Sequence, residues 1–285
     1  MFVILGGTGQ VGSATARALL NAGQEVMVVT RDEDHGADLK ASGAKMAVAD
    51  IRDTDAMRAV FRTGRRAFLL NPPAVPSGNT DAEERANVAA ILSALDGSGL
   101  EKVVAASTYG AFEGERCGDL TVLHELEQAL MDQPIPAAIN RGAYYMSNWV
   151  GVAQGVAESG ILPSFFPADL SLPMVAPADL GEAAARRLMT KTDDTGIEHV
   201  EGPARYSARD VAAAFAAVMG RYVDVQEVPP EALEETFLQF GFSEEAAASY
   251  ACMTRRVIDG KPDSVATFRK GAISLEAYFT SVLSG

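Results

Sequence analysis

The chain has 285 residues, of which 48% are apolar and 22% charged, with a formal net charge of −14. This length and composition predict a folded chain with one extended α/β domain or two unequal domains. The acidic balance excludes non-specific binding to nucleic acid and offers nothing to an anionic membrane surface. No apolar run is long enough to span a bilayer, and the opening Met1–Leu5 run lacks the features of a signal peptide. We therefore predict a cytoplasmic protein.

Short apolar runs alternate with helical patterns through the first half of the chain. The runs that predict strands are 2–5, 25–30, 45–50, 67–70, 102–106 and 135–139. The patterns that predict helices are 12–22, 37–42, 54–61 and 81–96. Continuous apolar strands separated by amphipathic helices are typical of a parallel sheet with both faces covered. The first half therefore predicts a Rossmann-type, doubly wound α/β fold.

The alternation of apolar runs and helical patterns is weaker in the second half of the chain. We expect a Pro- and Phe-rich loop over 162–174 and one short strand over 197–201. The helices expected in this half are 178–189, 208–219, 230–240 and 244–257. The expected organisation is a nucleotide-binding domain from 1–150 and 175–203. A smaller, mostly helical substrate-binding region would comprise 151–174 and 204–285.

Three glycines follow the first predicted strand with the spacing G-x-x-G-x-x-G. Gly6 permits a tight turn, Gly9 lets the backbone approach a pyrophosphate, and Gly12 lets helix and strand pack closely. The start of the following helix presents free N–H groups to the phosphates. The segment predicted to bind a dinucleotide comprises Gly6, Thr8, Gly9, Gln10, Val11 and Gly12. The alternative is a tight strand-to-helix turn without a ligand.

The end of the second predicted strand favours NADP(H) over NAD(H). An NAD site usually has an acidic residue about twenty positions after the glycine loop. This sequence has Thr30 and Arg31 there, and a guanidinium suits a 2′-phosphate. The alternative is that Arg31 is solvated and neutralised by the acidic residues at 32–34.

Three further strand ends should meet at the same crevice, because ligands of open α/β sheets bind at the carboxyl ends of strands. We assign the adenine side to Asp50 and Ile51, and the nicotinamide side to Asn71, Pro72, Pro73, Ser107 and Thr108. Each has a simpler alternative, because Asp50 could cap a helix and the two prolines could end one. Ser107 and Thr108 could cap a turn.

These features together resemble the short-chain dehydrogenase/reductase superfamily in its atypical NmrA-like branch. The resemblance runs nearly end to end through the glycine loop, 29–31, 69–73, Asn87, 102–104, 107–108, Glu127, 141–148 and 179–181. Gly142 stands where the family has proline, and Ala143 where it has glycine. Members of this branch include NADPH-dependent quinone reductases, reductases of aromatic or phenylpropanoid substrates, and redox-sensing regulators that bind NADP without known turnover.

The proton donor of ordinary superfamily members is absent, because no tyrosine here has lysine four residues later. The catalytic candidates are His124, whose imidazole titrates near neutrality, and Tyr144. Tyr144 and Tyr145 could form an aromatic wall of the substrate site, together with Tyr109 and Asn148. The alternatives are that the paired tyrosines pack a domain interface and that His124 is a surface residue.

The sequence shows no metal-ligand spacing, and Cys117 and Cys252 look like two lone thiols suited to a reducing compartment. Our leading hypothesis is an oxidoreductase that transfers hydride from NADPH to a quinone or similar conjugated acceptor. The alternative is a non-catalytic NADP(H) sensor that regulates a protein partner. A homodimer is compatible with either hypothesis. A third alternative, a sugar-nucleotide epimerase, is disfavoured because the tyrosine–lysine pair is absent.

Overall fold

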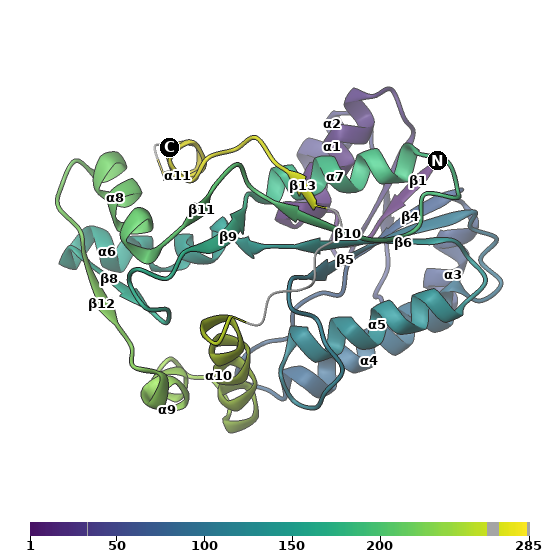
Figure 1. Cartoon of the computed structure of the whole chain (residues 1–285). Helices are drawn as coiled ribbons and strands as arrows, with labels where there is room; N and C mark the ends of the chain where they lie inside the picture. The colour runs from purple at the N-terminus through teal and green to yellow at the C-terminus, as the bar shows by residue number, and fades with distance from the viewer. Residues whose placement is uncertain (33, 261–267, 284–285) are drawn as a thin grey trace.

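A computed structural model describes residues 1–32, 34–260 and 268–283 of the chain. Its centre is an eight-stranded parallel sheet with the order β13-β10-β6-β5-β4-β1-β2-β3 (Figure 1). The strands are β1 (Phe2–Ile4), β2 (Val26–Thr30), β3 (Lys45–Val48), β4 (Arg66–Leu69), β5 (Lys102–Thr108), β6 (Ala137–Gly142), β10 (Gly196–Glu201) and β13 (Phe268–Lys270). The chain runs from β1 outward to β3 and then returns to β4, so the topological switch point lies between β1 and β4.

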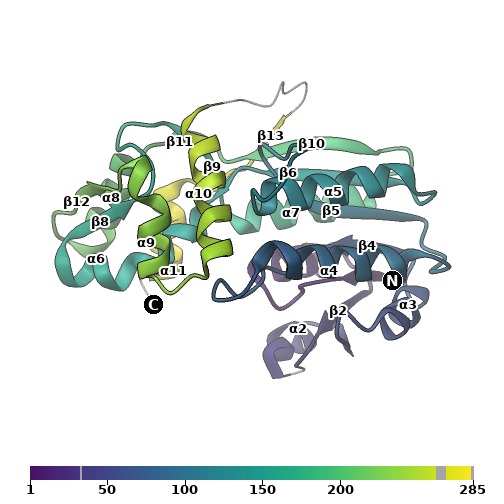
Figure 2. The same ribbon diagram turned by 90° about the horizontal axis from the view of Figure 1, so that it is seen from below.

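Helices cover both faces of the sheet, as Figures 1 and 2 show from two directions. One face carries α1 (Gln10–Asn21), α2 (Ala37–Ala41) and α7 (Pro177–Met189), and η1 (Asp34–Gly36) leads into α2. The other face carries α3 (Thr54–Arg62), α4 (Thr80–Leu95) and α5 (Asp119–Asp132). A separate hydrophobic core fills each face. The predicted doubly wound α/β fold is confirmed.

Close contact between α1 and α7 explains one glycine of the 179–181 segment. A Cβ added at Gly181 would lie 2.4 Å from the Cβ of Ala14. Only a glycine therefore lets these two helices approach at this point. The contact fixes α1, and with it the glycine loop that precedes α1, against the sheet.

The rest of the chain forms a second packing unit beyond the carboxyl ends of the sheet strands (Figure 1). Its strands are β7 (Tyr144–Tyr145), β8 (Ile161–Ser164), β9 (Leu172–Val175), β11 (Arg205–Tyr206) and β12 (Asp224–Glu227). Its helices are η2 (Met146–Val152), α6 (Ala153–Ser159), α8 (Ala208–Met219), η3 (Pro230–Ala232), α9 (Leu233–Gln239), α10 (Glu244–Ile258) and α11 (Leu275–Leu283). The division into two domains at the boundaries given above stays a prediction.

One expectation for this half was wrong. The segment 162–174 is not all loop, because it contains most of β8 and all but the last residue of β9. The mostly helical region after residue 204 also contains short strands that the sequence did not indicate, since β12 pairs with β8 and β13 joins the edge of the main sheet. These strands have three or four residues each, and they depend on partners far away in the sequence.

The prediction of two lone thiols was also wrong, because Cys117 and Cys252 form a disulfide. The two residues are 135 positions apart in the chain, and their Cα atoms are 5.2 Å apart. Packing of α10 against the segment before α5 brings them together, and local sequence carries no signal of that packing. The argument for a reducing compartment therefore loses its basis. Among the described residues, no helix is both long and apolar enough to cross a membrane.

Candidate functional site

The glycine loop joins β1 to α1 at the switch point of the sheet. Gly6 has a φ of +60°, and its carbonyl accepts a hydrogen bond from the N–H of Gly9 at 2.9 Å. A Cβ at Gly12 would lie 2.1 Å from that same carbonyl oxygen. Gly9 is exposed and serves as the N-cap of α1 without any side-chain cap. The first N–H groups of α1 are therefore open to an anion, and no acidic side chain stands in its first turn.

Thr30 and Arg31 end β2 directly beside this loop. The Thr30 hydroxyl donates to the Asp32 carbonyl at 2.8 Å and accepts from the Asp32 N–H, which turns the chain. The following residues lie close to the glycine loop, because a Cβ at Gly36 would be 3.7 Å from Cγ2 of Thr8. Arg31 therefore follows β2 at the point where the chain passes close to the glycine loop.

Asp32, the first acidic residue after Arg31, has other partners. The Asp32 carboxylate accepts from the Asp34 N–H at 3.0 Å and lies 3.6 Å from Nδ1 of His35. Arg31 is exposed, and we find no ion pair or hydrogen bond for its guanidinium within the described part of the chain. Glu33, the remaining acidic residue of this run, lies outside the described residues. The guanidinium is therefore available to an additional phosphate.

Asn71 follows β4 on the other side of the switch point. Both its side-chain amide oxygen and nitrogen are buried, and neither has a hydrogen-bond partner in the described structure. Its neighbour Leu70 lies against the loop, 3.0 Å from where a Cβ of Gly6 would be. Buried polar atoms without partners are rare, and a polar ligand in the crevice would satisfy both atoms of this amide. Together with the open helix start, they fit a dinucleotide that lies across this edge.

Pro72 and Pro73 continue from Asn71, and the carbonyl of Pro72 faces Nδ2 of Asn87 at 3.5 Å. On the adenine side, Asp50 accepts from the Arg52 N–H at 2.9 Å and does not cap α3. That cap is Asp53, which accepts from Ala56 at 3.0 Å. Ile51 packs against the core of this face. The helix-cap alternative for Asp50 is thereby removed.

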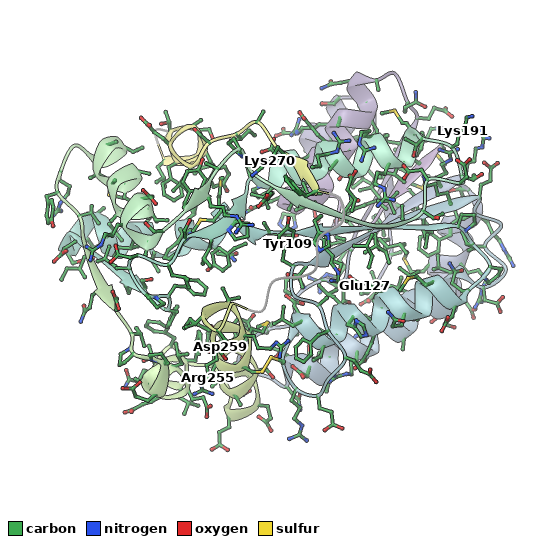
Figure 3. The ribbon with its side chains drawn as sticks, viewed as in Figure 1. Tyr109, Glu127, Lys191, Arg255, Asp259 and Lys270 are labelled. Carbon is green, nitrogen blue, oxygen red and sulfur yellow. A yellow bond between two sulfur atoms is a disulfide. The ribbon has the colours of Figure 1, made fainter. Side chains whose placement is uncertain are left out.

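Ser107 lies at the end of β5 in a buried polar network. Its hydroxyl donates to Oε1 of Glu127, a residue of α5. Arg141 of β6 donates to both carboxylate oxygens of Glu127, at 2.9 and 2.7 Å, and to the Ala111 carbonyl at 3.1 Å. Figure 3 marks Glu127 between α5 and the sheet. The Ser107 hydroxyl is therefore engaged by protein, and the network fixes the strand ends beside the crevice.

Three further residues predicted for the site, Thr108, Tyr109 and His124, lie in different environments. Thr108 donates to the Tyr109 carbonyl at 3.3 Å. The Tyr109 ring meets the His199 ring edge-on, with centroids 4.9 Å apart. Figure 3 shows Tyr109 beyond the carboxyl end of β5, near the middle of the molecule. His124 lies on α5, half-buried, and its Nδ1 has no hydrogen-bond partner among the described residues.

Tyr144 and Tyr145 face different surroundings. Tyr144 lies edge-on to Phe166, with centroids 5.2 Å apart, and near Trp149 at 6.0 Å. Burial raises the pKa of Tyr144 to about 12, against a hydrogen bond with Asn148 that lowers it. Tyr145 packs instead on the sheet side, 3.1 Å from where a Cβ of Gly142 would be. Tyr144 packs against the core of the second unit.

Sequence reasoning missed one carboxyl group of the candidate site, that of Asp119. Asp119 is the first residue of α5, and no hydrogen bond engages its carboxylate in the described structure. Desolvation by the surrounding protein raises the pKa of Asp119 to about 6, and the charge of Asp81 adds to the shift. Burial also raises the pKa of Tyr145, and the charge of Asp119 contributes. A carboxyl with this pKa exchanges protons near neutrality.

A family model described as the NmrA-like family matches residues 1–257. The chain belongs to the NmrA-like family. This result confirms the resemblance that the glycine loop and the later segments indicated. It also places the loop, Arg31 and Asn71 within the matched part of the chain.

Among curated proteins, this NmrA-like protein is similar to an NAD(P)H azoreductase of Xenophilus azovorans. The two are 24% identical over 248 residues, which are 87% of this chain and 84% of that protein. It is also 24% identical over 277 residues to a (4-alkanoyl-5-oxo-2,5-dihydrofuran-3-yl)methyl phosphate reductase of Streptomyces griseus. That match covers 92% of this chain and 94% of that enzyme.

Among solved structures, the NmrA-like protein is similar to Citrobacter sp. triphenylmethane reductase complexed with NADP(H). The TM-score is 0.76 at 18% identity, over 93% of this chain and 92% of that one. The NADPH-dependent quinone oxidoreductase QOR2 of Escherichia coli, complexed with NADPH, has a TM-score of 0.73 at 20% identity. That match covers 100% of both chains. At these identities the matches establish a common fold.

Proposed function

We propose that this NmrA-like protein binds NADP(H) along the carboxyl edge of its sheet and reduces a flat, conjugated acceptor such as a quinone. The observation that carries the proposal is the exposed guanidinium of Arg31 beside an uncapped helix start. A cationic group at this position suits a 2′-phosphate, whereas an NAD site usually has a carboxylate there.

Each part of the cofactor has a candidate partner. The N–H groups at the start of α1 would hold the pyrophosphate, and Arg31 would hold the 2′-phosphate. The orphaned amide of Asn71 would bond to the nicotinamide half. When bound there, NADPH supplies a hydride. The network of Ser107, Glu127 and Arg141 keeps the neighbouring strand ends in place.

The acceptor site would lie between the cofactor and the second packing unit. Tyr145 and Tyr109 line the sheet side, and Tyr144 with Asn148 begins the second unit. An aromatic surface of this kind suits a planar acceptor. The names of the matched proteins include reductases of azo compounds, triphenylmethane dyes and quinones, which supports an acceptor of this class.

Reduction of a quinone to a hydroquinone consumes one hydride and one proton in total. Because no tyrosine–lysine pair exists, the proton must come from another group or from solvent. The carboxyl of Asp119 is the candidate that the electrostatics favour, because its raised pKa keeps part of the population protonated near neutrality. His124 remains a second candidate, with its unpartnered Nδ1.

The test is the oxidation of NADPH and NADH by purified protein with a panel of simple quinones and azo dyes. We expect faster turnover with NADPH, and Arg31→Asp should reverse the preference, by roughly tenfold or more in kcat/KM. Arg209→Asp, which changes another exposed arginine far along the chain, is the matched control. An unchanged preference would contradict the cofactor assignment. Tight NADPH binding without turnover of any acceptor would instead support the non-catalytic sensor.

A further inference from the structure

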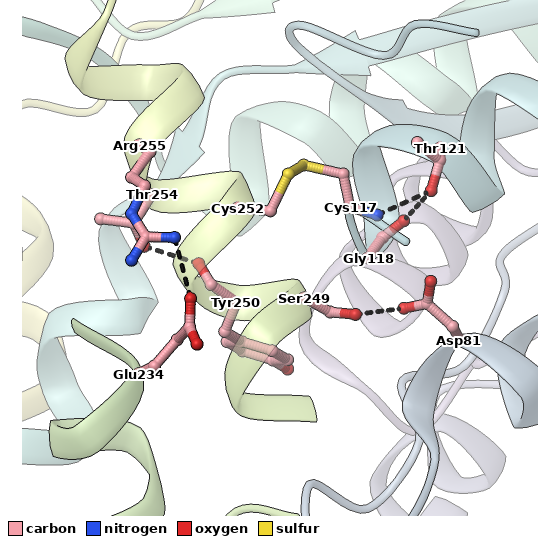
Figure 4. Close-up of a disulfide and its surroundings, with 10 residues drawn as sticks. All are labelled: Asp81, Cys117, Gly118, Thr121, Glu234, Ser249, Tyr250, Cys252, Thr254 and Arg255. Carbon is pink, nitrogen blue, oxygen red and sulfur yellow. Dashed lines mark hydrogen bonds and ion pairs between the residues drawn. A yellow bond between two sulfur atoms is a disulfide. The ribbon is translucent and has the colours of Figure 1, made fainter. Parts of the chain in front are cut away.

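The disulfide joins two parts of the chain that the hydride chemistry does not connect. Cys117 lies in the segment between β5 and α5, and Cys252 lies on α10 (Figure 4). Cys117 is completely buried, whereas Cys252 is partly exposed. The bond therefore ties the second packing unit to the nucleotide-binding half, with its more accessible residue on the helix.

One apolar side chain of α10, that of Met253, reaches the nucleotide-binding half, with its Sδ and Cε 2.7 Å from where a Cβ of Gly118 would be. Most of the other apolar contacts of α9 and α10 form a small cluster of their own, made of Leu233, Phe237, Ala247 and Ala251, with Phe165, Val228, Phe242 and Tyr250 packed against it. All of these residues belong to the second unit. Within the described residues, none of the hydrophobic clusters includes both α10 and the core of the main sheet.

The remaining attachments of α10 to the nucleotide-binding half are few and mostly polar. Ser243, the N-cap of α10, donates its N–H to the Pro76 carbonyl at 2.9 Å and its hydroxyl to Gly78 at 2.8 Å. Ser249 donates to Oδ1 of Asp81 at 2.8 Å, as Figure 4 shows. At the other end, the guanidinium of Arg256 stacks on Phe112, 3.6 Å from the ring centre. Hydrogen bonds of this kind add little net stability each, so the disulfide is the strongest link.

The link lies next to Asp119, the proposed proton donor. Cys117 precedes Asp119 by two residues, and Cys252 follows Tyr250 by two. Burial raises the pKa of Tyr250 to about 12, and the charges of Asp119 and Glu84 add to the shift. Figures 1 and 2 both show α10 beside the ends of α4 and α5. The position of α10 therefore decides how one wall of this region is closed.

We propose that Cys117 and Cys252 are a reversible redox-modification site that fastens α9–α10 to the nucleotide-binding half, and that reduction releases this wall beside Asp119. The reductant would be a small dithiol or a dithiol protein. Its thiolate attacks Sγ of Cys252, the sulfur–sulfur bond breaks, and Cys117 leaves as a thiolate that takes a proton. The second thiol of the reductant then displaces Cys252, so that two protein thiols and one oxidised reductant result.

The experiment compares hydrogen exchange of the whole native protein before and after treatment with dithiothreitol, with iodoacetamide labelling read by mass spectrometry. We expect no labelling before reduction and two labelled cysteines after it. Amides of 233–258 should then exchange roughly tenfold faster, whereas those of α1 should not change. Cys252→Ser should show the fast exchange without a reductant, and dithiothreitol should add nothing to it.

Three results would overturn the proposal. They are free thiols in the untreated native protein, a disulfide that resists dithiothreitol unless the protein is unfolded, and reduction without faster exchange in 233–258. The measurement needs neither cofactor nor acceptor, although the role beside Asp119 rests on the proposed function. A protein whose exchange responds to reduction but which never oxidises NADPH would contradict the proposed function alone. In an active protein, reduction should change KM for the acceptor at least threefold and leave NADPH binding unchanged.

Discussion

The glycine loop and the α9–α10 segment, the two walls of the proposed site, are held in place by different physical principles. The loop is shaped by backbone contacts, since added Cβ atoms at Gly12 and Gly6 would meet a carbonyl oxygen and Leu70 at 2.1 and 3.0 Å. The α9–α10 segment is placed by side chains that find partners far away, above all the disulfide between Cys117 and Cys252. A wall made by local backbone geometry leaves a pattern in the sequence, whereas a wall made by distant pairs leaves none.

The largest effect should come from the buried network that holds the strand ends between these walls. Glu127→Ala removes the carboxylate that pairs with the buried Arg141 guanidinium and also removes the acceptor of the Ser107 hydroxyl. Loss of one member of such a pair costs about 3–5 kcal/mol of unfolding free energy. Urea unfolding measures this loss. The control is Asp169→Ala, in the exposed pair with Arg209, which should leave the unfolding free energy nearly unchanged. Equal losses in the two variants would show that the network is not structural.

A change in the loop itself should act next most strongly. Gly12→Ala forces a methyl group to within 2.1 Å of the Gly6 carbonyl oxygen, so β1 and α1 must separate. We expect NADPH binding to weaken roughly 100-fold, which corresponds to about 3 kcal/mol. Fluorescence titration with NADPH measures the change. The control is Gly155→Ala, where an added Cβ meets nothing within 4 Å. Unchanged binding in Gly12→Ala would break the contrast drawn between the two walls.

The smallest effect concerns the carboxyls beneath α10. Burial, with the charge of Asp119, raises the pKa of Glu84 from 4.5 to about 7. The folded state therefore holds this proton more tightly than the unfolded state, and that stabilisation is complete below about pH 4.5 and is lost as the pH rises through about 7. Glu84→Gln cannot ionise, so its unfolding free energy relative to wild type should rise by about 2 kcal/mol across this range.

Chemical unfolding at several pH values measures this relative stability. Glu83→Gln, at the exposed neighbouring position, is the matched control. A flat difference between Glu84→Gln and wild type would show that Glu84 is not held in a desolvated place under α10. The contrast between the two walls would then rest on the disulfide alone.

The predictable part of the fold follows from short-range regularity. The helix expected over 208–219 is α8 to the residue, because Ser207 and Asp210 form a capping box at its start and Gly220 ends it. The parallel sheet was evident from its continuous apolar strands, although β13 was not. That edge strand has three residues and gains its order only from pairing with β10.

The candidate site likewise has a part that could be predicted from the sequence and a part that could not. Arg31 and the glycines were recognisable because their spacing to β1 and β2 is local. Asp119 was overlooked because its shifted pKa depends on burial and on Asp81, a residue of another helix. The orphaned amide of Asn71 became evident only when its surroundings were known. Properties that depend on what surrounds a side chain cannot be read from one sequence.

The central claim is that the open start of α1 and the guanidinium of Arg31 bind NADP(H). Isothermal titration calorimetry of the wild-type protein with NADPH, and in parallel with NADH, tests it most directly. We predict saturable binding of NADPH that is roughly tenfold or more tighter than that of NADH, since only NADPH offers the additional phosphate. The absence of binding heat with both nucleotides at millimolar concentration, or equal affinity for the two, would contradict it.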